Sequence, residues 1–186
     1  ARLYMLPRKR FYPFHDEVVN LILQGCATAL SKQLKIENLK NAAVIDPLTG
    51  CYNRREFESQ FKRHLANSKR HDSRLSLFLM DLDHFKQIND NFGHPCGDLV
   101  LKQVASLVKE NMRQGDILAR YGGEEFVAIL PETGKTKAME LADRLRSKIE
   151  NLRLSYGNDL VRVTASFGVS AFCPGKDMDM LIQEAD

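Results

Sequence analysis

The sequence lacks tryptophan, carries only four cysteines in 186 residues and has a net charge of only +3. The cysteines are Cys26, Cys51, Cys96 and Cys173. They are far apart and form no CxxC pair, which argues against a zinc site and a disulfide framework. We expect free thiols in a reducing, cytoplasmic compartment. The small net charge gives no reason to expect a nucleic acid as partner.

Long apolar runs are also missing, and none approaches the roughly 18 residues that a membrane-spanning helix needs. The first fourteen residues have prolines and charges where a signal peptide has its apolar core, so no signal peptide is expected. A parent protein tethered to a membrane stays compatible with this. Hydrophobic residues make up 44% and charged residues 27%, which is typical of a globular protein.

Three segments are expected along the chain. Residues 1–15 contain two prolines and no clean period, as the remnant of an upstream sensor unit would. Residues 16–45 show one long helical pattern. The apolar stripe of this pattern consists of Val19, Leu23, Cys26, Leu30 and Leu34. We expect a linker helix that forms a coiled coil with a second copy, and the alternative is a helix packed on its own domain. Residues 46–186 form the main domain.

The main domain alternates helical and strand patterns. Residues 75–82 are almost wholly apolar, as in a central strand buried on both faces. The order of elements predicts an α/β (α+β) fold of the ferredoxin-like kind, in which helices cover a mostly antiparallel central sheet. Helices are expected around 57–65, 85–89, 101–112 and 138–149, a turn at 93–95, and strands at 75–82, 117–121, 126–130 and 161–169.

Acidic residues lie at the ends of two of these strands. Asp81 and Asp83 end the buried strand, and Glu124 and Glu125 stand at the tip of a Gly-Gly hairpin. If the strands are neighbours, Asp81 and Glu124 converge, and converging carboxylates repel each other unless a cation lies between them. Hard oxygen ligands select Mg²⁺ or Mn²⁺. The alternative is that these acids merely solvate two strand ends.

Four motifs at matching separations carry a family resemblance. They are Tyr121–Phe126 (YGGEEF), Asp46–Arg55 (DPLTGCYNRR), Asp81–Asp98 (DLDHFKQIND through GHPCGD) and Thr164–Ser170 (TASFGVS). The segment 46–186 therefore resembles the GGDEF-family diguanylate cyclases, in the GGEEF variant. The resemblance implies a nucleotidyl-cyclase palm, which is the fold that the patterns predict.

The resemblance also implies a metal centre with two Mg²⁺ or Mn²⁺ ions. Asp81 and Glu124 would supply carboxylates, and Leu82 its backbone carbonyl. Glu124 or Glu125 would help to deprotonate the attacking 3′-hydroxyl, and the sequence does not decide which. Lys86 would place a positive charge on the phosphates, although a solvated helix lysine is its default interpretation.

Guanine recognition is implied for Asn89 and Asp98, with His94 nearby. A carboxylate offers two acceptors for the N1–H and the exocyclic amine of guanine, and adenine has no such pair of donors. The alternative for Asp98 is a helix N-cap. Further substrate contacts are expected from Phe85, Arg120, Gly122 and Gly123.

Arg113 and Asp116 form an RxxD placed just ahead of the hairpin, where the family has its inhibitory product site. An arginine fork holds phosphate and stacks on guanine. Arg144 is expected to assist, and a surface turn is the alternative.

The resemblance implies that two GTP molecules are joined into cyclic di-GMP across a homodimer, with release of two pyrophosphates and inhibition by the product. The rival functions are an inactive module that senses GTP or cyclic di-GMP, a structural dimerisation domain, and a cyclase that also accepts ATP. Relatives continue through a final helix with a lysine and an arginine that reach the phosphates. The domain is therefore expected to be C-terminally truncated.

Overall fold

A computed structural model describes residues 13–186, with the side chains of 17–33 and 44–186. It divides into two units, residues 1–41 and 42–186, each described by itself here. The predicted long helix is present as α1 (Pro13–Val44), and its side chains from 17 to 33 are all exposed. Most of the predicted upstream remnant lies outside the described residues. Among the described helices, none combines the length and apolarity needed to cross a bilayer.

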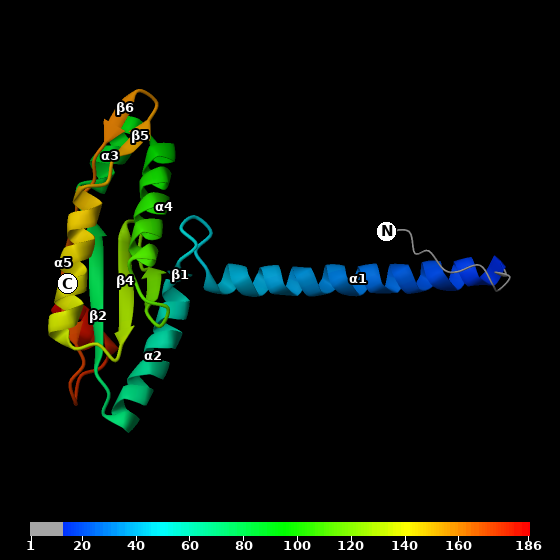
Figure 1. Ribbon diagram of the computed structural model, residues 1–186, viewed down its shortest axis with the longest axis horizontal. Helices are drawn as coiled ribbons and strands as arrows, with labels where there is room; N and C mark the ends of the chain where they lie inside the picture. The colour runs from blue at the N-terminus through cyan, green and yellow to red at the C-terminus, as the bar shows by residue number, and fades with distance from the viewer. Residues whose placement is uncertain (1–12) are drawn as a thin grey trace. The chain divides into compact units, whose positions relative to one another are not determined.

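The second unit is built on a five-stranded sheet with the strand order β1-β3-β4-β2-β7 (Figure 1). Only β1 and β3 are parallel, and the other neighbouring strands are antiparallel. This order, with helices between the strands, confirms the predicted ferredoxin-like fold. The strands are β1 (Tyr52–Asn53), β2 (Leu75–Leu82), β3 (Ile117–Arg120), β4 (Glu125–Pro131) and β7 (Ala165–Ala171).

Helices cover both faces of the sheet because successive side chains of β2 point to opposite sides. Leu75, Leu77 and Leu79 pack with α2 and α6 in one apolar cluster. Phe78, Met80 and Leu82 belong to a second cluster with α3, α4 and α5. The prediction that this strand is buried on both faces is therefore confirmed. The helices are α2 (Arg54–His71), α3 (Phe85–Phe92), α4 (His94–Glu110), α5 (Lys135–Glu150) and α6 (Met178–Ala185).

The strand predicted over 161–169 is wrong, because the segment contributes to two different sheets. Residues Asp159–Val161 form β6, which pairs with β5 (Leu154–Tyr156) in a separate hairpin, whereas β7 pairs with β2. Gly157 turns that hairpin with a φ of +61°. Val161, Val163 and Ala165 are all buried, so the alternation is real although it spans a break between strands.

The boundary between the two middle helices also differs from the prediction. The turn predicted at 93–95 shrinks to Gly93, which has a φ of +82° and caps both helices. Pro95 lies in the first turn of α4, where its missing N–H has no intrahelical partner to lose. Met112 lies beyond the end of α4 at Glu110.

Candidate active site

The Gly-Gly hairpin closes tightly on its own backbone. Tyr121 N–H donates to the Glu125 carbonyl at 2.8 Å, and Gly122 N–H donates to the same oxygen at 3.3 Å. A Cβ atom on Gly122 would lie 2.2 Å from Oε2 of Glu125. Glycine is therefore what lets the Glu125 carboxylate fold back over the turn.

The acidic strand ends come together as predicted. Asp81 is the register partner of Glu125 across β2 and β4, which sets Glu124 beside the same strand end. Burial, the charge of Asp81 and the charge of Glu125 raise the pKa of Glu124. Burial and the charge of Asp83, followed by that of Asp186, raise the pKa of Asp81. The ionised forms are thus held in an unfavourable field that a cation would relieve.

The chemistry of these donors fits a hard divalent ion. In the described part of the chain, no side chain donates a hydrogen bond or an ion pair to the carboxylate of Asp81 or Glu124, so both are available as ligands. Among the described residues, no cluster of three or more His, Cys, Asp or Glu side chains is arranged to bind a metal, so the protein side chains alone do not complete a metal site. Proteins usually bind Mg²⁺ through one or two carboxylates, and substrate phosphates complete the coordination. Two carboxylates at one strand end therefore suffice for such a site.

The neighbouring acid, Asp83, is occupied in a different way. Its carboxylate accepts hydrogen bonds from Thr164 Oγ1 at 2.6 Å and from Ser166 Oγ at 2.7 Å. The two acids at the end of β2 therefore differ, because Asp83 is hydrogen-bonded whereas Asp81 has no side-chain donor among the described residues.

The predicted guanine readers lie at the corner between α3 and α4. A Cβ atom on Gly97 would lie 2.0 Å from Oδ1 of Asn89, so the amide of Asn89 covers the glycine that precedes Asp98. His94 and Asp98 are exposed. Because α4 begins at His94 with Gly93 as its cap, Asp98 lies inside the helix, and the N-cap alternative is wrong. Its carboxylate has no side-chain partner among the described residues and remains available to a ligand.

The other predicted phosphate and base contacts differ in exposure. The Lys86 side chain is exposed on the first turn of α3. Phe85 is buried at 7% exposure in the core cluster, with its ring edge against Gly97. Phe85 therefore supports the α3–α4 corner from the core, and its contact with substrate stays a prediction.

Arg120 has protein partners that the sequence did not reveal. Its guanidinium donates to the Gly123 carbonyl at 2.7 and 3.1 Å and pairs with the Asp46 carboxylate at 3.3 Å. Asp46 also accepts from the backbone and hydroxyl of Thr49, at 2.9 and 2.6 Å. Partial burial acts in the opposite direction, but these hydrogen bonds and the Arg120 charge lower the pKa of Asp46. Arg120 thus ties the hairpin tip to the start of the domain, and its substrate contact stays a prediction.

A second arginine near the hairpin, Arg54, had no predicted role. The guanidinium of Arg54 stacks over the Tyr121 ring at 4.4 Å, and Tyr121 meets Phe57 edge to face at 5.8 Å. The family motif around Arg54 was the only signal for it, because no periodicity relates residues so far apart in sequence. The hairpin is therefore held at two points, at Gly123 by Arg120 and at Tyr121 by Arg54.

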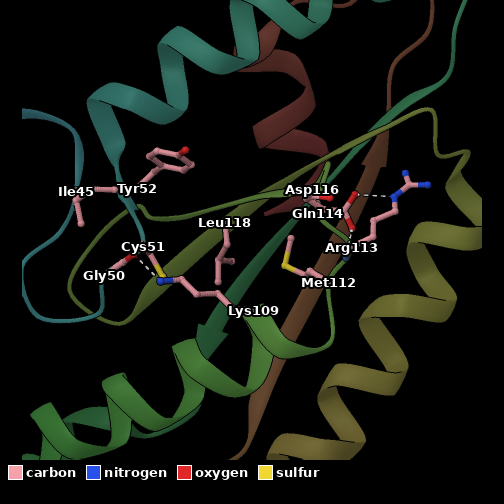
Figure 2. A pocket seen from close by; sticks show the side chains of 10 residues that line it. All are labelled: Ile45, Gly50, Cys51, Tyr52, Lys109, Met112, Arg113, Gln114, Asp116 and Leu118. Atoms are coloured by element: carbon pink, nitrogen blue, oxygen red, sulfur yellow. Dashed lines mark hydrogen bonds and ion pairs between the residues drawn. The ribbon is translucent and has the colours of Figure 1, made fainter. Parts of the chain in front are cut away.

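The predicted product site forms a partly pre-built arginine corner. Arg113 donates to Asp116 through Nε at 2.9 Å, and its Nη2 binds the Pro131 carbonyl and the Thr133 hydroxyl. A cavity of about 340 Å³ beside it is lined by Lys109, Arg113 and Asp116, among others (Figure 2). A second cavity of about 400 Å³ brings Arg113, Asp116 and Arg144 into one lining. Arg144 is itself held by the Asn111 carbonyl at 3.2 Å.

Comparisons with known proteins agree with this geometry. Residues 43–186 match the family described as "Diguanylate cyclase, GGDEF domain". The chain is 37% identical over 151 residues to diguanylate cyclase DgcP of Pseudomonas aeruginosa, covering 81% of this chain and 22% of DgcP. It is 39% identical over 147 residues to the response regulator PleD of Caulobacter vibrioides, covering 77% of this chain and 32% of PleD.

Among solved structures, the coiled coil and GGDEF domain of DgcB from Caulobacter crescentus, in complex with c-di-GMP, matches with a TM-score of 0.82. It is 26% identical, and the match covers 90% of each chain. This chain belongs to the GGDEF domain family of diguanylate cyclases. It spans between a fifth and a third of the length of DgcP and PleD.

Proposed function

We propose that residues 46–186 form a diguanylate cyclase domain that binds one GTP on Mg²⁺ or Mn²⁺. The observation that carries the proposal is the pairing of Asp81 with the Gly-Gly-Glu-Glu turn, where two carboxylates with raised pKa values have no cationic partner among the described residues. Bound metal, two ions by the family resemblance, would neutralise the triphosphate and the charge that builds on the leaving pyrophosphate.

The protein's own groups then have distinct tasks. Asp81, Glu124 and the Leu82 carbonyl would hold the ions, and Lys86 would approach the phosphates from the first turn of α3. The exposed Asp98 and the neighbouring Asn89 bind the Watson–Crick edge of guanine, with His94 close by. The site thereby excludes adenine, which would leave these acceptors unpaired. Glu124 or Glu125 accepts the proton of the 3′-hydroxyl as it attacks the α-phosphate of the second nucleotide.

One domain presents one nucleotide, so the reaction needs two domains face to face. We propose that α1 supplies this pairing as a coiled coil, which brings two reactants into a defined orientation. The exposed side chains of α1 support this, including Leu23 and Leu30 at 57% and 62%. The DgcB structure that matches this chain contains a coiled coil as well as the catalytic domain.

Regulation is proposed at two places. An upstream sensor in the same protein would change the pairing of α1, and cyclic di-GMP would bind at Arg113, Asp116 and Arg144 as an inhibitor. The shared cavity of these three side chains supports the second proposal. The four free cysteines support a cytoplasmic location for the domain.

The test is to incubate the chain with GTP and Mg²⁺ and to detect cyclic di-GMP by mass spectrometry. We expect product from the native chain and from Glu150→Gln, an exposed control at the end of α5, and none from Glu124→Gln. Binding of GTP or cyclic di-GMP without any product at protein concentrations that favour the dimer would overturn the proposal in favour of an inactive sensing module. Arg113→Ala should keep turnover and lose inhibition by added product.

A further inference from the structure

The turn between β2 and α3 holds the metal-binding end of the strand in an unusual conformation. Leu82 ends β2 and Phe85 begins α3, so only Asp83 and His84 connect them. His84 has a φ of +57° and a ψ of +24°, in the left-handed region that a residue with a Cβ atom adopts at a cost. Such a conformation persists only where the surrounding contacts enforce it.

Asp83 supplies those contacts through three hydrogen bonds to β7 and the residue before it. Its Oδ2 and Oδ1 accept from Thr164 Oγ1 at 2.6 Å and Ser166 Oγ at 2.7 Å. Its backbone N–H donates to the Thr164 carbonyl at 3.0 Å, one residue beyond the end of the β2–β7 ladder. A side chain and a backbone group of one residue are thus fixed by Ser166 of β7 and by Thr164, which precedes that strand.

The choice of partner is informative. Ser166 is the register partner of Asp81, yet its hydroxyl bonds to Asp83 and leaves Asp81 without a donor in the described part of the chain. Hydroxyls that donated hydrogen bonds to Asp81 would compete with a metal ion for the lone pairs of its carboxylate. The arrangement keeps one acid open and uses the other as an anchor.

We propose that Asp83, clamped by Thr164 and Ser166, is a positioning residue for the reaction. This rests on the function proposed above. The clamp fixes the turn so that the Leu82 carbonyl and the Asp81 carboxylate face Glu124, and so that the first amides of α3 and Lys86 face the phosphates. Asp83 touches neither metal nor nucleotide.

Three variants of the full chain separate a positioning role from metal ligation. Asp83→Ala removes both acceptors. Thr164→Val combined with Ser166→Ala removes both donors and leaves the carboxylate in place. Asp83→Asn keeps an oxygen acceptor and turns the other group into a donor, which a serine or threonine hydroxyl can accept. Ser106→Ala, which loses only an exposed bond to Glu110, is the control.

If Asp83 acts by position, the alanine variant and the double hydroxyl variant should both lose about 30-fold in kcat, because small misplacements cost about that much or more. The asparagine variant should keep at least a third of native kcat, and Ser106→Ala all of it. If Asp83 were a metal ligand, Asp83→Asn would be as inactive as Asp83→Ala, and the double hydroxyl variant would stay active. That pattern would overturn the proposal.

Hydrogen exchange at the amides of residues 83–86 measures the clamp independently of turnover. We expect the double hydroxyl variant to exchange at least tenfold faster there, with no change in the strands β3 and β4. Unchanged exchange would overturn the proposal even if kcat fell. A native chain that makes no cyclic di-GMP would instead count against the proposed function, and the exchange result would still decide whether the clamp exists.

Discussion

Replacing Asp81 by asparagine should stabilise the metal-free domain and abolish its response to magnesium. Burial and neighbouring acids raise the pKa of Asp81 and of Glu124. A carboxyl whose pKa is raised by folding binds its proton more tightly in the folded state. Its stabilising contribution is therefore complete below the unfolded pKa and is lost as the pH rises through the folded pKa.

The expected size follows from the ordinary strength of charge repulsion at a protein surface. Two like charges near a protein surface repel by roughly 1–4 kcal/mol at about 4 Å. Asp81 is exposed and Glu124 half-exposed, so solvent screening reduces this to about 0.5–1 kcal/mol. For a domain of this size that corresponds to an increase of about 1–4 °C in Tm at pH 8. The increase should shrink as the pH falls and vanish below the ordinary carboxyl pKa of about 4, where the carboxyls are protonated in both the folded and the unfolded state.

Scanning calorimetry with and without Mg²⁺ and a non-hydrolysable GTP analogue tests this. The native chain should gain about 2.7 kcal/mol when the ligand is at a hundred times its Kd, and Asp81→Asn should gain little. Asp159→Asn, an exposed acid on the β5–β6 hairpin, should change neither value. A lower Tm for metal-free Asp81→Asn, or a full response to magnesium and the analogue, would refute the reasoning.

Three further substitutions address the hairpin and the base site. Arg120→Ala removes the half-buried pair with Asp46 and both bonds to Gly123, so the free energy of unfolding should fall by about 1–3 kcal/mol in urea titrations, whereas the exposed control Arg146→Ala should lose much less; equal losses would contradict the tie. Gly122→Ala should displace the Glu125 carboxylate and lower kcat at least tenfold with little effect on Tm, and unchanged turnover would show that the position of Glu125 is unimportant. Asp98→Ala should raise the KM for GTP about 10- to 100-fold and reduce the preference for GTP over ATP in competition assays, and an unaltered preference would remove Asp98 from base recognition.

Periodicity in the sequence predicted the parts of the fold that pack. The apolar run 75–82 is β2 with the predicted bounds, and Phe57 and Phe61 of α2 are fully buried. The alternation over 161–169 predicted one strand where the chain has parts of two, because burial alone does not say which neighbour a strand pairs with. β1 is too short to show a period, and the β5–β6 hairpin and α6 have patterns of only a few residues.

The site was predictable in its acids and not in its supports. The strand ends at Asp81 and Glu124 were identifiable because both elements have clear patterns. The link from Asp46 to Arg120 spans 74 residues, and that from Asp83 to Thr164 spans 81, so only the folded sheet brings them together. For the same reason periodicity did not distinguish Asp81 from Asp83; the family resemblance assigned Asp81 to the metal and gave Asp83 no role, and the hydrogen bonds of the folded chain supply one.

The central claim is that Asp81 and Glu124 share a divalent ion that holds the triphosphate. Crystals grown with Mn²⁺ and a non-hydrolysable GTP analogue test it directly through the anomalous signal of manganese. We predict a peak at about 2.1 Å from a carboxylate oxygen of each residue, with the guanine beside Asn89 and Asp98. A nucleotide bound elsewhere, with Asp81 and Glu124 turned apart and no anomalous peak between them, would contradict the account.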